Sequence, residues 1–478
     1  MIINPSIIPF LLAVISALLS VISFPPFNLS YLAWIAFVTL FISIKNQKLK
    51  KTFLLGFVQG CFFYAALFYG LISYSWLVFL ATLVYLSLFT AIFSLLTTFL
   101  QARLKHFHGV IPPVIWTSLE FLKTIGPFSF PTSIGVSQYQ SISLIQMATV
   151  TGIYGISFWI ILINSYVAEC LQDFLHKGKV SIRNIITLSL IIFLTTGIML
   201  YGSKRESLPN SLSFSTSIIQ GSIPVWLYQI APYDPKYSQI VENTYSELTK
   251  GSVKRKPQII VWPETNLGVF IREDEKWKEK IRQFAYEGTS YIILGTPTKD
   301  KEGNQYNSAL VFSPKGKIIG QYDKVNLVPF AEQRFKAGRE IKPISSPIGK
   351  LGVVICYESV YPSISRKLIQ EGASFLIILT NDAWFKKTPV AYLHAVSAVF
   401  RAVENRSYVI RAAQSGISMI IDPYGNILEK TLLFVPGALK GVVKLREKTT
   451  LYSRFGDLFS CCCLLGTFIL LAFSLWQR

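Results

Sequence analysis

Acidic side chains are almost absent from the first 201 residues, which contain three Asp or Glu against ten Lys or Arg. This part consists instead of long apolar runs, and the whole chain is 51% hydrophobic. The composition excludes an ordinary soluble domain there and predicts membrane-spanning helices, which need about 20 apolar residues each. The remaining residues hold 23 of the 26 acids and 36 of the 46 Lys and Arg, as expected of a basic globular domain. We expect that domain to contact anionic lipid. No basic patch interleaved with aromatics occurs, so no nucleic-acid partner is expected.

Cysteine and histidine are scarce as well. Of six cysteines and four histidines, only Cys356 and His394 lie between residues 202 and 458. An internal disulfide is therefore excluded in this part. The chain lacks a Cys/His spacing typical of a zinc site and a glycine-rich phosphate loop. We therefore expect no metal and no other cofactor.

Eight apolar runs are predicted to cross a membrane. They are Ile7–Phe24, Tyr31–Ile44, Thr52–Ser73, Trp76–Leu100, Val110–Leu122, Ile142–Ala168, Ile185–Tyr201 and Phe459–Trp476. This pattern divides the chain into a transmembrane helical domain of seven spans (1–201), a globular domain (202–458) and a C-terminal transmembrane helix (459–478).

The loops between these runs alternate in charge. The loops after the second, fourth and sixth runs carry Lys45, Lys48, Lys50 and Lys51, then Arg103 and Lys105, then Lys177, Lys179 and Arg183. The intervening loops contain no Lys or Arg except Lys123 at a border. Since positive loops stay in the cytoplasm, we expect both termini inside and residues 202–458 outside.

Strand and helix patterns alternate within residues 202–458. Strands are expected at 213–220, 258–262, 291–295, 308–312, 318–322, 353–355, 375–379, 408–412, 418–421 and 427–429, and helices at 237–250, 274–287, 363–371 and 391–405. A turn at Pro314–Gly316 joins two of the strands as a hairpin. The alternation indicates a layered α/β domain.

Cys356 stands where an apolar, β-branched strand ends. A helix is expected to follow, closed by Gly372. A thiol just before a helix N-terminus feels the positive end of the helix dipole, which favours the thiolate. Cys356 is therefore a candidate nucleophile, although a free cysteine in a strand is often a small buried hydrophobe.

Two further polar residues follow strands, as Cys356 does. Glu264 comes after the apolar run IIVWP, and Lys324 after the second hairpin strand. Acid, amine and thiol together suit acyl transfer: Glu264 would move the protons, Lys324 would stabilise the oxyanion, and Cys356 would carry the acyl group. His394, on a helical stretch, is interpreted as a surface or packing residue.

Four sequence blocks resemble the nitrilase superfamily: VWPET (Val261–Thr265), YDKVNLVPFAE (Tyr322–Glu332), ICYES (Ile355–Ser359) and TNDAWF (Thr380–Phe385). With the apolar runs they resemble one membrane family of it, the apolipoprotein N-acyltransferases. FPPF at Phe24–Phe27, WTSLEFLK at Trp116–Lys123 and RAVENR at Arg401–Arg406 extend the resemblance over nearly the whole chain. It implies an α-β-β-α sandwich domain on about eight membrane helices.

The resemblance also implies roles for single residues. The family's catalytic triad falls on Glu264 as proton acceptor, Lys324 in oxyanion stabilisation and Cys356 as nucleophile. The supporting residues would be Glu332 as a second active-site acid, Tyr357 as an amide donor to the oxyanion, Glu358 as structural support, Asn307 as a hydrogen-bonding residue and Trp384 near the mouth of the site.

The reaction that the resemblance implies is a ping-pong acyl transfer. Cys356 would take a fatty acyl chain from a phospholipid and pass it to the α-amino group of an S-diacylglyceryl cysteine, at the N-terminus of an apolipoprotein. The enzyme would be a multi-pass protein of the bacterial inner membrane, with its catalytic domain on the periplasmic face.

Three alternatives remain from the sequence. A membrane-anchored amidase of the nitrilase type would use the same triad, with water in place of the amine. A transporter with a sensing domain would need charges inside the membrane, and only Glu120 is a clear candidate. A catalytically inactive scaffold would have a broken triad, and this triad is complete.

Overall fold

The computed structural model describes residues 6–104, 107–126, 129–130, 132–204, 212–231, 233–265, 267–329, 331–446 and 448–476. Lys105 and Phe330, which entered the sequence analysis, lie outside the described residues. The chain divides into two compact units. A helical unit comprises Met1–Arg205, Thr388–Leu393 and Phe455–Arg478, and an α/β unit comprises Glu206–Lys387 and His394–Arg454.

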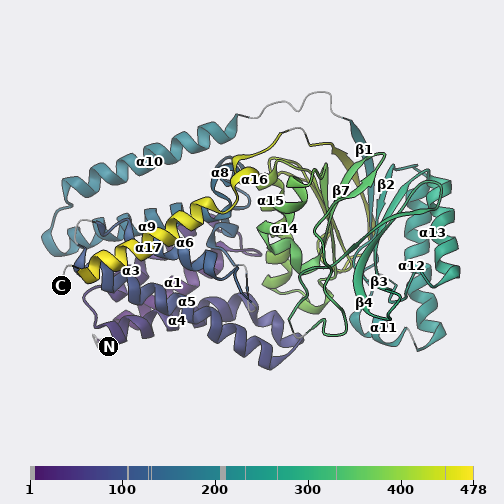
Figure 1. Cartoon of the computed structure of the whole chain (residues 1–478). Helices are drawn as coiled ribbons and strands as arrows, with labels where there is room; N and C mark the ends of the chain where they lie inside the picture. The colour runs from purple at the N-terminus through teal and green to yellow at the C-terminus, as the bar shows by residue number, and fades with distance from the viewer. Residues whose placement is uncertain are drawn as a thin grey trace. The chain divides into compact units, whose positions relative to one another are not determined.

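The helical unit contains eleven α-helices in its described residues. They are α1 (Ile8–Ser23), α2 (Ala33–Ala36), α3 (Val38–Ile44), α4 (Leu49–Phe68), α5 (Trp76–Arg103), α6 (Ile111–Leu122), α7 (Ile142–Ile145), α8 (Ala148–Thr151), α9 (Ile153–Lys177) and α10 (Ile182–Ser203), and they are joined by α17 (Leu458–Trp476) from the C-terminal end of the chain. Within this unit α4 packs along α5, and α6 packs against both α9 and α17 (Figure 1). The α4–α5 contact is close at Gly56, where a Cβ atom would lie 2.5 Å from the carbonyl oxygen of Thr90.

Among the described residues, five helical segments are long and apolar enough to cross a membrane. They are Leu49–Ser73, Trp76–Arg103, Ile153–Lys177, Ile182–Ser203 and Leu458–Trp476. Shorter apolar segments lie at Ile8–Ser23, Ser30–Ile44, Ile111–Leu122 and Ile142–Thr151. The prediction of eight spans is therefore not confirmed, although the apolar helices are compatible with a transmembrane protein.

One predicted span is wrong as a single helix. The run Ile142–Ala168 is divided among α7, α8 and α9, and the break before α9 lies at Gly152. Gly152 has φ 65° and ψ −176°, a backbone conformation that is essentially restricted to glycine. Hydropathy alone did not reveal the break, because the residues on both sides of this glycine are apolar.

The α/β unit is built on two six-stranded sheets. The first sheet has the order β12-β1-β2-β3-β4-β5 and the second has the order β11-β10-β9-β8-β7-β6. The strands of the first are β1 (Ser213–Gln220), β2 (Ile259–Val261), β3 (Tyr291–Lys299), β4 (Gln305–Phe312), β5 (Ile318–Asp323) and β12 (Gly437–Lys444). Those of the second are β6 (Ile344–Ser346), β7 (Gly349–Ile355), β8 (Phe375–Thr380), β9 (Val409–Ala413), β10 (Met419–Ile421) and β11 (Ile427–Lys430).

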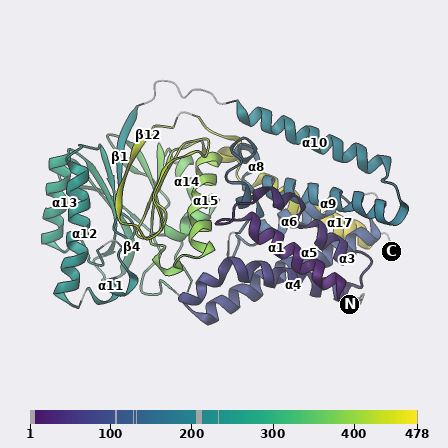
Figure 2. The same ribbon diagram turned by 180° about the vertical axis from the view of Figure 1, so that it is seen from behind.

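Apolar side chains fill the space between the two sheets, because strand residues alternate between faces. Val261 of β2 and Val311 of β4 belong to one buried cluster with Val353 of β7 and Ile377 of β8. The opposite faces are covered by helices: α12 (Pro235–Val253) and α13 (Glu275–Gly288) on one side, α14 (Pro362–Gln370) and α15 (Pro389–Asn405) on the other (Figures 1 and 2). Two short helices, α11 (Val225–Ile230) and α16 (Leu451–Phe455), complete the unit. The predicted α-β-β-α sandwich is confirmed.

The sequence analysis missed the edge strand β12. It pairs antiparallel with β1, from Ser213 opposite Lys444 to Gln220 opposite Gly437. Its residues from Gly437 to Val442 alternate between half-buried and exposed positions, Val443 alone is buried, and the strand contains Gly437 and Gly441. A strand at the edge of a sheet needs little apolar sequence, so its pattern is weak.

Candidate active site

The proposed nucleophile lies at the carboxyl end of β7. Cys356 begins a short 3-10 helix, Cys356–Val360, which leads into α14. Its φ is +52°, in the left-handed region that residues with a side chain rarely adopt. Such strain concentrates at functional sites, and here it turns the chain sharply between the strand and the helix. The helix expected after Cys356 is confirmed as α14.

Glu264 follows β2, which is a buried strand of the other sheet. Its side chain is 7% exposed. One carboxylate oxygen accepts from the side-chain amide of Asn307 at 2.8 Å, and the other accepts from the backbone N–H of Asn381 at 3.0 Å. The Cys356 thiol also hydrogen-bonds to this carboxyl group. The acid and the thiol therefore face the same site, although they follow strands of different sheets.

Lys324 follows β5, and its ammonium group points into the same cluster. Nζ lies 3.5 Å from Oε1 of Glu264 and 2.8 Å from Oε2 of Glu332. The Lys324 side chain is fully buried. A buried ammonium must be paired with an acid, and here it is held between two.

Asn307 joins the two acids. Its side-chain nitrogen donates to Oε1 of Glu264 at 2.8 Å and to Oε1 of Glu332 at 2.7 Å. Its backbone carbonyl accepts from the N–H of Lys324 at 2.8 Å. The β4–β5 pairing therefore fixes the amine relative to both carboxylates.

The electrostatics of the cluster favour a neutral thiol at rest. Burial raises the pKa of Cys356, the charge of Glu264 raises it further, and Lys324 opposes both. This corrects the expectation that a helix dipole makes the resting group a thiolate, because desolvation acts in the opposite direction and favours the thiol. Burial also raises the pKa of Glu264, against the lowering effect of Lys324. Burial alone would lower the pKa of Lys324, but the charges of Glu264, Cys356 and Glu332 raise it overall.

Glu358 lies beneath this cluster and connects its parts. Oε1 accepts from the hydroxyl of Tyr322 at 3.0 Å and from the backbone N–H groups of Val325 and Asn326 at 2.7 and 3.1 Å. Oε2 accepts from the N–H of Ile355 at 2.8 Å. Burial raises the pKa of Glu358, opposed by these hydrogen bonds. One carboxyl group thus ties the turn after β7 to the Lys324 loop.

Two further predicted residues lie on the surrounding turns. Tyr357 is half-buried, and its ring stacks edge-on against Tyr361. Trp384 lies on a 3-10 turn, Ala383–Phe385, and is 42% exposed. An amide role for Tyr357 and a place for Trp384 at the mouth of the site stay predictions.

The sequence analysis missed a second buried cluster beside Cys356. Asp382, Arg411 and His394 contact one another, and His394 Nε2 lies 3.1 Å from the carbonyl oxygen of Cys356. His394 is therefore not on the surface, and it packs directly under the nucleophile. Arg411 is the signal that could have found the cluster, since a charged residue in an otherwise apolar strand needs a partner.

No metal site emerges from these groups. In the stretches that the structure describes, no group of three or more His, Cys, Asp or Glu side chains could hold a metal ion. The positive charge at this site comes from Lys324. The absence of a cofactor stays a prediction.

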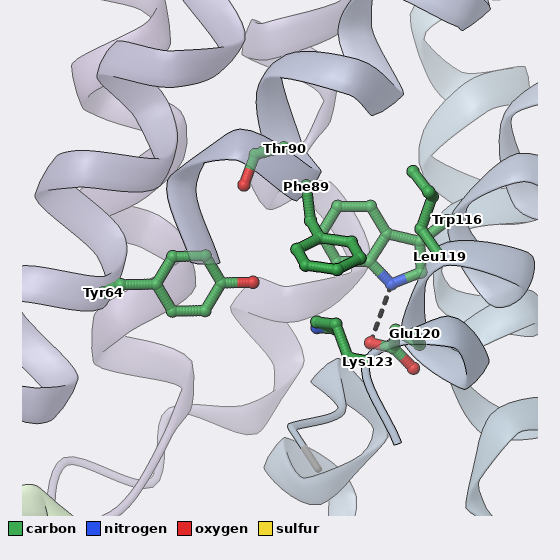
Figure 3. Close-up of a pocket in the computed structure, with 7 residues that line it drawn as sticks. All are labelled: Tyr64, Phe89, Thr90, Trp116, Leu119, Glu120 and Lys123. Carbon is green, nitrogen blue, oxygen red and sulfur yellow. Dashed lines mark hydrogen bonds between the residues drawn. The ribbon is translucent and has the colours of Figure 1, made fainter. Parts of the chain in front are cut away.

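The helical unit has a polar cluster of its own around Glu120 (Figure 3). Oε1 of Glu120 accepts from the indole N–H of Trp116 and from the N–H of Ile134, both at 2.8 Å. Lys123 and the hydroxyl of Tyr64 face the same small cavity of about 10 Å³. That volume is about the size of one water molecule, so this pocket gives no support to the transporter alternative.

Comparison with known proteins covers both units. Residues 225–437 match the family model for carbon–nitrogen hydrolases, and residues 16–166 match that for the N-terminal domain of apolipoprotein N-acyltransferase. An apolipoprotein N-acyltransferase of Geobacter metallireducens is 31% identical over 98% of this chain and 96% of its own length. That of Borreliella burgdorferi is 29% identical over 94% and 92%.

Solved structures resemble only part of the chain. A carbon–nitrogen hydrolase from Helicobacter pylori has 19% identity and a TM-score of 0.41, and it covers 49% of this chain and 90% of its own. An amidase from Nesterenkonia has the same identity and TM-score, with 53% and 96% covered.

The sandwich, together with the matching model, defines the α/β unit as a carbon–nitrogen hydrolase domain. The full-length match is more specific: the chain belongs to the apolipoprotein N-acyltransferase family. The family supports an acyltransferase over the amidase alternative.

Proposed function

We propose that this protein transfers a fatty acyl chain from a membrane phospholipid to the α-amino group of the N-terminal S-diacylglyceryl cysteine of a bacterial apolipoprotein. The contact of an acid, an amine and a thiol in the α/β unit carries this proposal. Glu264 hydrogen-bonds to the thiol of Cys356, and Lys324 is held between Glu264 and Glu332. The apolar helices of the other unit support a lipid substrate.

In the first half-reaction Glu264 takes the thiol proton and Cys356 attacks an ester carbonyl of the phospholipid. Lys324 stabilises the tetrahedral oxyanion with its charge. The C–O bond then breaks, Glu264 returns the proton to the departing oxygen, and a lysophospholipid leaves. A thioester remains on Cys356.

In the second half-reaction the neutral α-amine of the lipoprotein attacks this thioester. Glu264 accepts the proton that the amine loses on attack. The C–S bond breaks, an amide forms, and the proton returns to the sulfur of Cys356. Because the raised pKa of Cys356 favours the thiol, reprotonation restores the resting enzyme.

Water would compete with the amine at the thioester. Hydrolysis would make the protein an amidase or lipase, so acyl transfer requires the acceptor amine to occupy the space beside Cys356.

The charge pattern of the loops supports a location in the bacterial inner membrane with several spans, cytoplasmic termini and the α/β unit on the periplasmic face.

Acyl trapping tests the proposal. The purified protein is incubated with labelled phospholipid and no acceptor, and the label on Cys356 is located by mass spectrometry. We expect a hydroxylamine-sensitive label in the wild type and in Cys61→Ala, which removes a cysteine of the helical unit. Cys356→Ala should acquire no label, and Glu264→Gln should acquire it at least about 100-fold more slowly, as for loss of a general base.

A diacylated lipopeptide is then added to the labelled protein. Label that moves to the peptide amine supports the transferase. Label released as free fatty acid at an undiminished rate when the peptide is present contradicts it. An unlabelled wild type that hydrolyses short amides would restore the anchored amidase.

A further inference from the structure

Three buried ionisable side chains lie beside the nucleophile and take no part in the reaction above. Asp382, Arg411 and His394 are 1%, 0% and 7% exposed. Nη2 of Arg411 donates to Oδ2 of Asp382 at 2.7 Å, and Nδ1 of His394 lies 2.7 Å from Oδ1 of the same carboxylate. Buried charges are costly unless they are paired, and Asp382 pairs with both neighbours.

The remaining ring nitrogen of His394 is directed at the main chain of the nucleophile. Nε2 lies 3.1 Å from the carbonyl oxygen of Cys356 and 3.1 Å from Oγ of Ser359. A carbonyl oxygen can only accept a hydrogen bond, so Nε2 must carry a proton to make this contact. Nδ1 faces the carboxylate of Asp382 at 2.7 Å, which orients the ring.

The ionic state of Asp382 fits this arrangement. Burial would raise the pKa of Asp382, but the charge of Arg411 and the contact with His394 hold it well below its usual range. Arg411 Nη2 lies 3.4 Å from Nδ1 of His394, and the hydroxyl of Thr380 donates to Oδ1 of Asp382 at 3.0 Å. Since Nε2 is engaged with the carbonyl of Cys356 and Nδ1 with the carboxylate of Asp382, His394 does not duplicate Glu264.

We propose that His394 is a positioning residue for the nucleophile, which it holds by donating from Nε2 to the carbonyl of Cys356. This bond fixes the left-handed backbone, φ +52°, that aims the thiol at Glu264. The segment that carries Asp382 also holds the base, because the backbone N–H of the neighbouring Asn381 donates to Glu264 at 3.0 Å. Asp382 and Arg411 act through His394 by fixing its ring. The inference rests on the proposed role of Cys356.

The test measures two rates in the full-length protein. One is the alkylation of Cys356 by iodoacetamide, followed by mass spectrometry of its peptide. The other is acyl transfer, resolved into kcat and KM for the phospholipid. We expect His394→Leu, which lacks a donor, to lower kcat and the alkylation rate by about 10- to 100-fold, as for a small misplacement of a reacting group. KM should stay within about twofold, since the bond acts on the nucleophile and not on lipid binding.

Two variants separate this role from general structural support. His394→Gln keeps an N–H donor near the carbonyl and should recover at least about tenfold of the lost rate. Ser359→Ala removes the other neighbour of Nε2 and should retain the wild-type alkylation rate. Thermal unfolding of each variant is measured in parallel.

Three results would overturn the proposal. In the first, Cys356 of His394→Leu is alkylated at the wild-type rate. In the second, the rates of all variants follow their Tm, and His394→Gln is no faster than His394→Leu. In the third, Ser359→Ala loses as much of the alkylation rate as His394→Leu does. Alkylation needs no lipid, so the series still tests the positioning role if the acyl-trapping experiment refutes the proposed function.

Discussion

At the scale of single residues, Glu332 controls the charge on the proposed base. Its carboxylate shares Lys324 with Glu264, and its negative charge is one of the factors that raise the pKa of Glu264. Glu264 must be ionised to accept a proton, so activity falls as the pH drops through its raised pKa. The acid limb of kcat/KM reports this group in the free enzyme.

Replacing Glu332 by Gln removes that negative charge, and the ammonium group of Lys324 then no longer shares its ion pairing between Glu264 and a second carboxylate. Both changes lower the pKa of Glu264, so we expect the acid limb of kcat/KM to move to lower pH. The measurement is acyl transfer across a pH series. Glu340→Gln is the control, because Glu340 pairs with Lys342 on the surface, where their side chains are 64% and 63% exposed. An unmoved limb, or one that moves to higher pH, would contradict the charge argument.

Glu358 makes a separate prediction, for stability. Replacing it by Ala leaves the three N–H groups of Val325, Asn326 and Ile355 and the hydroxyl of Tyr322 without their acceptor. Each buried donor left unpaired costs roughly 1–3 kcal/mol, so Glu358→Ala should unfold at a clearly lower Tm.

Glu358→Gln provides the comparison, since its amide oxygen retains one acceptor. Its Tm should lie between those of the wild type and Glu358→Ala, as followed by scanning calorimetry in detergent. If all three proteins had the same Tm, water would replace the carboxylate as hydrogen-bond acceptor with no loss of stability.

The sequence predicted some of these residues and missed others for a physical reason. Glu264, Lys324 and Cys356 each follow a strand or hairpin, and strand ends can be located from local apolar patterns. The contacts of His394 with Asp382 and Arg411 depend on how β8, β9 and α15 pack together. No local pattern in a helix reports what its buried face touches, so His394 was interpreted as an ordinary packing or surface residue.

At the scale of elements, local sequence patterns again predicted some features of the helical unit and missed others. The apolar runs were found, because hydropathy is a local property. The break between α8 and α9 was not, since it depends on one backbone conformation at Gly152. The layers of the α/β unit were predictable from alternating strands and helices, whereas β12 became a strand through its pairing with β1.

Gly152→Ala tests that break. A side chain at φ 65° and ψ −176° is strained, by roughly 1–3 kcal/mol for conformations of this kind. We therefore expect a lower Tm of the detergent-solubilised protein. Gly197→Ala is the matched control, because Gly197 lies within helix α10 and a Cβ atom there would meet nothing within 4 Å. Replacing a helical glycine by alanine favours the helix, so Gly197→Ala should melt no lower than the wild type.

If Gly152→Ala has the same Tm as the wild type, residues 142–177 would tolerate a different backbone conformation at residue 152. A continuous helix through residue 152, as the hydropathy predicted, would then regain support.

At the scale of the whole molecule, the loop charges predict how the chain is inserted. Lys48 lies in a positive loop between α3 and α4, and Lys315 lies in the turn between β4 and β5. If positive loops stay in the cytoplasm, the first is inside and the second is outside. A cysteine introduced at either position, in a chain that keeps Cys356 and whose Cys61, Cys170 and Cys461–Cys463 are replaced by Ser, reports the side.

Intact spheroplasts are treated with a membrane-impermeant maleimide for this measurement. Lys315→Cys should react before the membrane is opened, and Lys48→Cys only after detergent is added. The half-buried thiol of Cys356 should react slowly in both backgrounds, since desolvation raises its pKa and maleimides react with the thiolate. The reverse pattern would place the α/β unit in the cytoplasm, where the amino termini of exported lipoproteins are not presented. The acyltransferase would then need a different acceptor, while the chemistry of Cys356 would stand unchanged.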